Sequence, residues 1–211
     1  MSKFRPDHVL DCRSVIYPVP ILRAEQALAS MSPGQVLEVQ ATDANVKPDL
    51  ATWAARVNNE ILAVEDSDGG FSFFVRKGRA AAPADAIAKE ERSLFLVVLR
   101  SGLNAPGQVR AALMYASIAC AMDQDTVVYC VQEGADVMVK GAPEKEQTKP
   151  GVPTIAQRLA EAIEIGVRLE VCEQTADTRG IKAEDLIAEA KLIGGASLID
   201  YAIRSRGQLT F

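Results

Sequence analysis

The sequence contains very little histidine, and its cysteines do not follow a metal-binding spacing. Among 211 residues there is one histidine, His8, and four cysteines, which are Cys12, Cys120, Cys130 and Cys172. A single imidazole is too few for the common histidine metal sites, and it leaves one candidate base for Ser-His-Asp catalysis. Because no Cys-x-x-Cys pair occurs, neither a zinc knuckle nor a disulfide framework is indicated. The sequence therefore predicts reduced thiols, no bound metal and no cofactor.

The sequence also lacks a hydrophobic run long enough to cross a membrane. The helical stretch at residues 111–122 has no charged side chain, but it is shorter than the roughly 18 apolar residues that a spanning helix needs. The N-terminal region carries Asp7 and Asp11 and has no apolar stretch typical of a secretory signal. We therefore expect a cytoplasmic protein with no membrane partner.

An excess of positive charge is absent as well. Lys and Arg total 23 against 28 Asp and Glu, which gives a formal net charge of -5. Since no basic tail is present, we expect no direct nucleic-acid binding. Hydrophobic residues make up 48% and charged residues 24% of the chain, which is ordinary for a folded protein and argues against disorder.

The composition divides the chain into two domains. Residues 79–92 are rich in alanine and in charged side chains and interrupt the strand pattern, so we interpret them as a linker between a domain at 1–78 and a domain at 93–211. In the first domain we expect a strand at 8–13, a helix that begins near Pro18, a strand at 35–41, a helix around 48–57 capped by Asp43 or Asn45, and a hairpin of 61–66 with 71–77. This order, βαβαββ, predicts a two-layer α/β sandwich.

The second domain alternates apolar strands with helical patterns. The expected strands are 93–99, 126–132, 167–173 and 208–211, and the expected helices are 106–122, 153–166, 184–191 and 198–204. Residues 133–152 form a long loop that is either solvated or serves as a lid or oligomer contact. The alternation predicts a flavodoxin-like α/β domain with a mainly parallel sheet.

The first domain resembles the TusA/SirA-like sulfur carriers. The resemblance covers about residues 7–77 and is carried by four segments, namely Leu10-Asp11-Cys12-Arg13, the Pro18-x-Pro20 pair that opens a helix, Gly34-x-x-Leu37-Glu38-Val39 and Ala41-Thr42-Asp43. The family motif is Cys-Pro-x-Pro, whose thiol carries a persulfide at a helix N-terminus. Tyr17 takes the place of that cysteine here, and a phenol cannot hold sulfane sulfur. The resemblance thus implies a docking module without its carrier thiol.

The second domain resembles the DsrE/DsrF-like family over about residues 93–211. The resembling segments are the strand and loop at 94–107, Cys172-x-x-x-Ala176 leading into Gly180-Ile181, Glu184-Asp185-Leu186, and the closing Leu209-Thr210-Phe211. The resemblance implies assembly into homo-oligomers, partnership with other sulfur-relay proteins, and a persulfide on the cysteine at the position of Cys172. The two resemblances together are more specific than either one alone.

Cys172 is the candidate catalytic residue. It follows the strand 167–171 at the carboxyl end, where open parallel sheets place their ligands. A helical turn beginning near Gln174 or Thr175 would aim backbone N–H groups at the thiolate, whereas Glu170 and Glu173 would oppose ionisation. A packed structural thiol is the alternative, because free cysteines are often simply buried.

The remaining candidates have simpler explanations. Cys120 and Cys130 lie in apolar patterns and are expected in the core, and Cys12 belongs to a strand. The loop at 101–107 precedes a helix N-terminus and could hold an anion, although it matches no nucleotide-binding motif. Taken together, the two resemblances imply a sulfur-relay protein, sulfurtransferase-like if Cys172 is reactive. The alternative is a non-catalytic scaffold or regulatory protein of a sulfur-metabolism complex.

Overall fold

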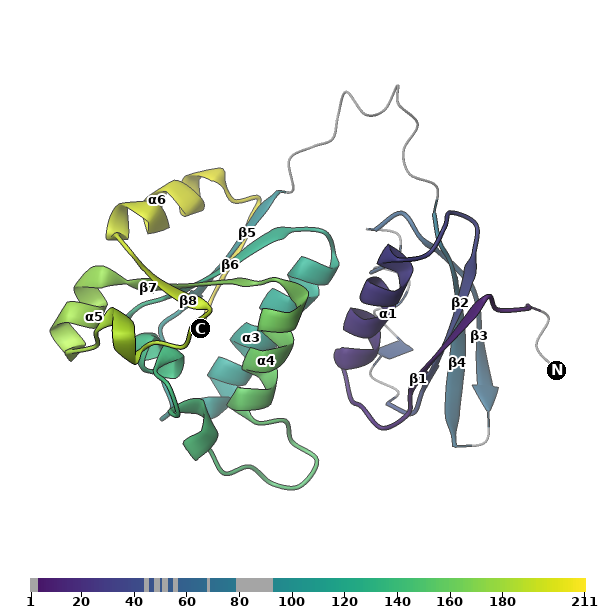
Figure 1. The fold of residues 1–211 in the computed structure, drawn as a ribbon, viewed down its shortest axis with the longest axis horizontal. Helices are drawn as coiled ribbons and strands as arrows, with labels where there is room; N and C mark the ends of the chain where they lie inside the picture. Colours follow the sequence, from purple (N-terminus) through teal and green to yellow (C-terminus); the bar gives the residue numbers. More distant parts are fainter. Residues whose placement is uncertain are drawn as a thin grey trace. The chain divides into compact units, whose positions relative to one another are not determined.

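The computed structural model describes residues 4–43, 46–47, 50, 53–54, 57–67, 69–78 and 93–211. Its contacts divide the chain into two compact units with a boundary between residues 91 and 92. The expected linker at 79–92 and most of the expected helix around 48–57, with its candidate cap Asn45, lie outside the described residues. Both units are mixed α/β structures, as the sequence predicts (Figure 1).

The first unit is a four-stranded sheet covered on one face by a helix (Figure 1). The elements are β1 (His8–Cys12), α1 (Val19–Ala29), β2 (Val36–Ala41), β3 (Glu60–Ser67) and β4 (Gly70–Arg76), with sheet order β1-β2-β4-β3. Strands β1 and β2 pair in parallel, and β4 pairs antiparallel with β2 and β3. The expected hairpin is therefore confirmed.

Helix α1 begins next to Pro18, as predicted, because proline is tolerated in the first turn of a helix. Ile21, Ala24 and Leu28 are buried along one stripe, which is the spacing that the sequence indicated. In the hairpin, Phe71, Phe73 and Val75 point to the core, and Phe74 is buried on the opposite face of β4. The first unit thus buries large side chains on both faces of β4.

The second unit is a five-stranded, entirely parallel sheet with strand order β8-β7-β6-β5-β9. Its strands are β5 (Leu94–Leu99), β6 (Asp125–Cys130), β7 (Arg168–Cys172), β8 (Ala190–Ile193) and β9 (Gly207–Thr210). Its helices are α3 (Pro106–Ala121), α4 (Ile155–Ile165), α5 (Glu173–Arg179) and α6 (Gly195–Arg204). Helices α3 and α4 lie together on one face of the sheet, and α6 covers the other (Figure 1).

Helix α4 shows how the local sequence sets an element's ends. Thr154 and Gln157 form a capping box at its start, and Gly166 ends it in the left-handed conformation. Its inner stripe, Ile155, Leu159 and Ala162, packs in the larger core between the sheet and α3. A smaller core on the opposite face contains Cys172.

Two expectations for this unit are wrong. The helix expected at 184–191 is a 3-10 turn at Ala183–Asp185 followed by strand β8. Its backbone is held instead by other segments, because the N–H of Ile187 donates to the Met138 carbonyl and β8 pairs with β7. Tertiary pairing here overrides helix propensity.

The segment expected as a loop at 133–152 is also partly regular. It contains 3-10 helices at Gln132–Met138 and Pro143–Lys145. Val137 and Met138 are fully buried in the larger core, so this first part is neither a solvated loop nor a lid. Glu146 anchors the second part, since its carboxylate accepts the backbone N–H of Ile155 and pairs with Arg110.

Candidate functional site

Cys172 is the last residue of β7 and the N-cap residue of α5. Its side chain is 7% exposed and packs in the smaller core with Tyr129 and Tyr201. The strand supplies the rigid position, and the helix supplies backbone N–H groups that have no partner within their own first turn. The structure therefore places the thiol at the carboxyl edge of the parallel sheet, where the sequence predicted it.

The surroundings of the thiol favour its ionised form. Partial burial alone raises the pKa of Cys172, but hydrogen bonds from the backbone N–H and hydroxyl of Thr175, the Tyr129 hydroxyl and the Gln174 N–H outweigh it. The net effect is a pKa below the usual value for a cysteine, because each of these donors stabilises the thiolate. In its protonated form the thiol donates to Oε1 of Gln174, with an Sγ to Oε1 distance of 3.2 Å.

Tyr129 links the thiol to the start of α6. Its ring is fully buried, and its hydroxyl donates to the carbonyls of Gly194 at 3.2 Å and Ile193 at 3.4 Å. A hydroxyl has one proton, so Tyr129 can give it either to these carbonyls or to the sulfur. Burial, the Cys172 sulfur and nearby negative charge raise the pKa of Tyr129, which keeps it a donor.

Replacing Tyr129 by phenylalanine should therefore raise the pKa of Cys172. Because the wild-type thiol has a lowered pKa, its thiolate is present at lower pH than that of a free cysteine, and its alkylation by iodoacetamide should begin to rise there. In Tyr129→Phe the rise moves to higher pH, and the rate at neutral pH falls severalfold.

Peptide-resolved mass spectrometry of the alkylated chain measures this profile. Tyr201→Phe is the matched control, since the Tyr201 hydroxyl bonds to Glu170 rather than to the sulfur. An unchanged profile in Tyr129→Phe would mean that Tyr129 does not stabilise the thiolate.

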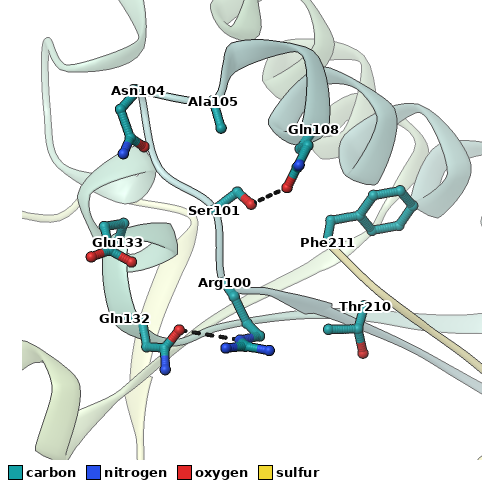
Figure 2. A pocket seen from close by; sticks show the side chains of 9 residues that line it. All are labelled: Arg100, Ser101, Asn104, Ala105, Gln108, Gln132, Glu133, Thr210 and Phe211. Atoms are coloured by element: carbon teal, nitrogen blue, oxygen red, sulfur yellow. Dashed lines mark hydrogen bonds between the residues drawn. The ribbon is translucent and has the colours of Figure 1, made fainter.

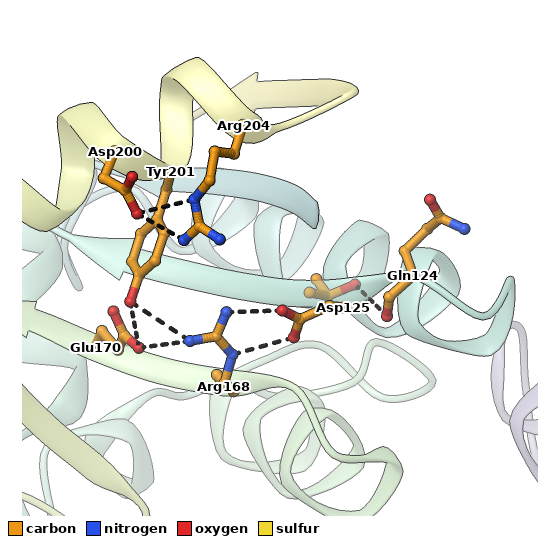
Figure 3. Close-up of polar contacts among 8 residues, drawn as sticks. Gln124, Asp125, Arg168, Glu170, Asp200, Tyr201 and Arg204 are labelled. Atoms are coloured by element: carbon orange, nitrogen blue, oxygen red, sulfur yellow. Dashed lines mark hydrogen bonds and ion pairs between the residues drawn. The ribbon is translucent and has the colours of Figure 1, made fainter. Parts of the chain in front are cut away.

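A network of charged side chains attaches α6 to the sheet beside this core (Figure 3). Arg168 makes two hydrogen bonds to Asp125, at 3.0 and 3.1 Å, and one to Glu170 at 3.1 Å. Tyr201 of α6 donates its hydroxyl to the same Glu170 oxygen at 3.2 Å. The Arg168 guanidinium also lies 5.3 Å from the centre of the Tyr201 ring. The network thus pairs Glu170, which the sequence predicted would oppose ionisation of Cys172, with the Arg168 guanidinium.

The other cysteines lie in less reactive surroundings. Cys12 and Cys130 are fully buried, and burial raises the pKa of both thiols, with Glu170 adding to the effect at Cys130. Cys120 is partly buried and donates to the Ile165 carbonyl, with an Sγ to O distance of 3.2 Å. The expected core positions of Cys120 and Cys130 are confirmed, and the pKa of Cys172 is lowered where those of Cys12 and Cys130 are raised.

Tyr17 is half-buried in the segment before α1. Its backbone N–H donates to the Asp43 carboxylate at 2.7 Å. Asp43, which the sequence offered as a cap for the expected second helix, thus holds the chain just before α1. Cys12, Tyr17 and Asp43 all belong to the first unit.

The loop at 101–107 lines an open pocket of about 680 Å³ (Figure 2). The pocket lies where β5 and β6 end, at the carboxyl edge of the sheet. Its lining residues are Arg100, Ser101, Asn104, Ala105, Gln108, Gln132, Glu133, Thr210 and Phe211. The loop expected to hold an anion therefore forms one wall of a real cavity.

Sequence reasoning missed Tyr129 and the Arg168 network. A signal was available, because Tyr129 is a polar side chain within a buried apolar strand, and residues 170 and 172 alternate onto one face of β7. What the sequence lacks is the strand order that brings these positions together.

Within the ranges that the structure describes, none of the helices combines the length and the apolar character that crossing a bilayer requires. Among the same residues, no three His, Cys, Asp or Glu side chains gather into a group that could hold a metal ion.

Comparison with known proteins identifies similar sequences for both units. The sequence model of the DsrE/DsrF-like family matches residues 93–211, and that of sulfurtransferase TusA matches residues 8–77. An uncharacterized protein of Methanocaldococcus jannaschii is 24% identical over 202 residues, which are 95% of this chain and 72% of that protein. The sulfur carrier protein TusA of Allochromatium vinosum is 39% identical over 71 residues, which are 34% of this chain and 93% of that protein.

Among solved structures, the crystal structure of the ychN protein from E. coli is similar to part of this chain. The superposition has a TM-score of 0.48 at 17% sequence identity, and it covers 56% of this chain and 99% of that one.

Proposed function

Because the chain belongs to the DsrE/DsrF-like family through residues 93–211 and to the TusA family through residues 8–77, we propose that it accepts or hands on sulfane sulfur as a persulfide on Cys172. The presence of both domains supports a role in sulfur relay. The observation that supports a persulfide on Cys172 in particular is the lowered pKa of its thiol, which is caused by the hydrogen-bond donors around it at the carboxyl edge of the sheet.

The chemistry that this role requires is one nucleophilic displacement. The Cys172 thiolate attacks the outer, sulfane sulfur of a donor, a new S–S bond forms, and the donor's S–S bond breaks. With thiosulfate the leaving group is sulfite, and with polysulfide it is the shorter polysulfide. The electron pair of the broken bond leaves with that group, so no oxidant or reductant is consumed. Hydrogen bonds from Thr175 and Tyr129 stabilise the attacking sulfur.

We propose that the first domain is a docking module without its carrier thiol. Tyr17 occupies the place of the family cysteine before α1, and a phenol forms no persulfide. The fully buried Cys12, whose pKa is raised, is poorly suited to replace it. The adjacent side chain of Ile16 is 40% exposed and offers an apolar contact for a partner. The partners proposed for this domain are the sulfur donor and acceptor proteins of a cytoplasmic relay.

Assembly into a homo-oligomer through the second domain is part of the same proposal. On α6, Ile199 and Ile203 are 60% and 78% exposed and lie one helical turn apart. Paired aliphatic side chains on a helix surface favour contact with another protein surface.

Mass spectrometry of the intact chain after incubation with polysulfide or thiosulfate tests the central proposal. We expect a gain of sulfur that peptide mapping places on Cys172. Sulfur mapped to Cys12 would move the carrier role to the first domain. A folded chain that takes up no sulfur on any cysteine would refute the carrier role and favour a non-catalytic scaffold or regulatory protein.

A further inference from the structure

Besides Cys172, the carboxyl edge of the parallel sheet carries the pocket at the ends of β5 and β6 (Figure 2). The proposed function does not use this pocket. We propose that it binds the α-aminocarboxylate end of a small persulfide, such as cysteine persulfide, whose sulfur is then transferred to Cys172. This inference rests on the proposed function, because it names the class of donor that the Cys172 site takes.

The charges of the lining residues favour a ligand that carries both signs. Arg100 and Glu133 are the two charged side chains of the lining. An arginine guanidinium matches a carboxylate with two parallel hydrogen bonds. A simple anion is attracted by Arg100 but repelled by Glu133, and a simple cation the reverse, whereas a zwitterion can be attracted by both. The other polar groups of the lining are hydroxyls and amides, which suit the same ligand.

The Arg100 side chain is held in place by one hydrogen bond, and its two terminal nitrogens can still donate others. Its Nε donates to Oε1 of Gln132 at 3.1 Å, which turns the guanidinium toward the pocket (Figure 2). Its backbone N–H donates to the Phe211 carbonyl at 2.7 Å, and its own carbonyl accepts the N–H of Gly134 at 3.0 Å. Within the described chain, the two terminal nitrogens of Arg100 make no hydrogen bond. They are therefore available to a carboxylate.

The two walls of the pocket are held together by close backbone contacts. A Cβ atom at Gly102 would lie 2.6 Å from the carbonyl oxygen of Glu133, and one at Gly134 would lie 2.1 Å from that of Leu99. Since real Cβ atoms do not approach so closely, both positions require glycine. The backbones that carry Arg100 and Glu133 are thus fixed relative to each other, which is what recognition of two charges on one small ligand requires.

The pocket and the thiol lie at the same edge of the sheet, and Arg100 of the pocket lies on the face that carries the thiol, whereas Gln108 and Phe211 belong to the face that α3 covers. Across β5, β6 and β7, the structure pairs Leu99 with Cys130 and Cys130 with Val171. The next residue on each of these three neighbouring strands is Arg100, Val131 or Cys172, so these three positions are in step. Neighbouring strands are about 4.8 Å apart, which places the backbones of Arg100 and Cys172 about 10 Å from each other. Val98 and Val131 pack against the core that contains Cys172, and alternation then places Arg100 on that face too.

This separation suits a molecule of the size of an amino acid. With the carboxylate on Arg100, the sulfur of cysteine persulfide extends toward β7. The Cys172 thiolate attacks the terminal sulfur, the S–S bond of the donor breaks, and cysteine leaves as its thiolate while Cys172 becomes the persulfide. The charge on sulfur passes from Cys172 to the departing cysteine, so the step is balanced without another reactant.

The rate of Cys172 persulfide formation, followed by intact mass, tests the inference with two donors. Arg100→Gln should lower the rate with cysteine persulfide by about tenfold or more, the loss expected for one charge-assisted pair. The rate with inorganic polysulfide, which has no carboxylate to pair with the guanidinium, should fall much less. Arg76→Gln is the matched control, because Arg76 is an exposed arginine of the other unit paired with Glu60. Equal losses with both donors, or no loss with either, would overturn the proposal.

Binding of S-methyl-L-cysteine, measured by calorimetry on the full-length Cys172→Ser chain, separates this inference from the proposed function. We expect saturable binding that Arg100→Gln weakens by about tenfold, and weaker binding of 3-(methylthio)propionate, which lacks the amino group. Glu133→Gln should remove that preference for the amino group. Absence of binding would overturn the inference even if Cys172 forms a persulfide. Binding to a chain whose Cys172 takes sulfur from no donor would refute the proposed function and support the ligand class.

Discussion

Replacing Cys172 by serine is expected to abolish the uptake of sulfane sulfur by this chain. A serine hydroxyl has no thiolate form and makes no S–S bond, so the displacement has no nucleophile. The fold should remain, because serine fits the space of cysteine and the neighbouring donors Thr175 and Tyr129 can bond to its oxygen. The change in the free energy of unfolding should be within about 1–2 kcal/mol, as for a single hydrogen-bonded site.

The other cysteines provide internal controls for this result. Cys12→Ser and Cys130→Ser change fully buried thiols whose pKa is raised, so uptake should persist in both, at some cost in stability. Intact mass spectrometry with a donor present, together with circular dichroism of each variant, makes the comparison. Sulfur uptake that survives in a folded Cys172→Ser chain would end the assignment of Cys172 as the carrier.

Replacing Arg168 by methionine should destabilise the second unit strongly. Arg168 is the cationic partner of Glu170, whose side chain is 7% exposed and whose Oε2 has no hydrogen-bond partner among the described residues. Removing one member of a buried pair leaves an uncompensated charge, which costs roughly 3–5 kcal/mol in full burial. The Arg168 side chain is 40% exposed, and solvent screening reduces the expected loss to about 2–3 kcal/mol.

Urea unfolding of four variants, which are Arg168→Met, Glu170→Gln, the double variant and Arg76→Met, measures this loss and its cause. The double variant Arg168→Met with Glu170→Gln should recover part of the lost stability, because the buried carboxylate is then neutral. Arg76→Met, which breaks the exposed pair with Glu60, should cost less than about 1 kcal/mol. If the double variant is as unstable as the sum of its single changes, Arg168 acts through packing on Tyr201 rather than through charge.

Much of the fold could be predicted from local patterns. The stripe of Ile21, Ala24 and Leu28 and the turn at 67–70 specify α1 and the hairpin, because periodicity and turn residues act over a few positions. The segment at 184–191 could not be predicted in the same way. Its acidic and apolar residues read as a helix, but contacts with Met138 and with β7 make it a turn and a strand. Because these contact partners are distant in sequence, no local pattern predicts the contacts.

For the candidate site, the sequence by itself singled out the candidate cysteine and its place in the fold. Cys172 follows an apolar strand and precedes a helix start, and the arrangement of both elements is local. Only the tertiary structure decided its environment. Tyr129 comes from a neighbouring strand, and Gly194 and Tyr201 come from the β8–α6 region, so their meeting at the thiol depends on strand order. Periodicity fixes which face a residue occupies, but hydrogen bonding and ionisation at that face depend on partners that are far away in the chain.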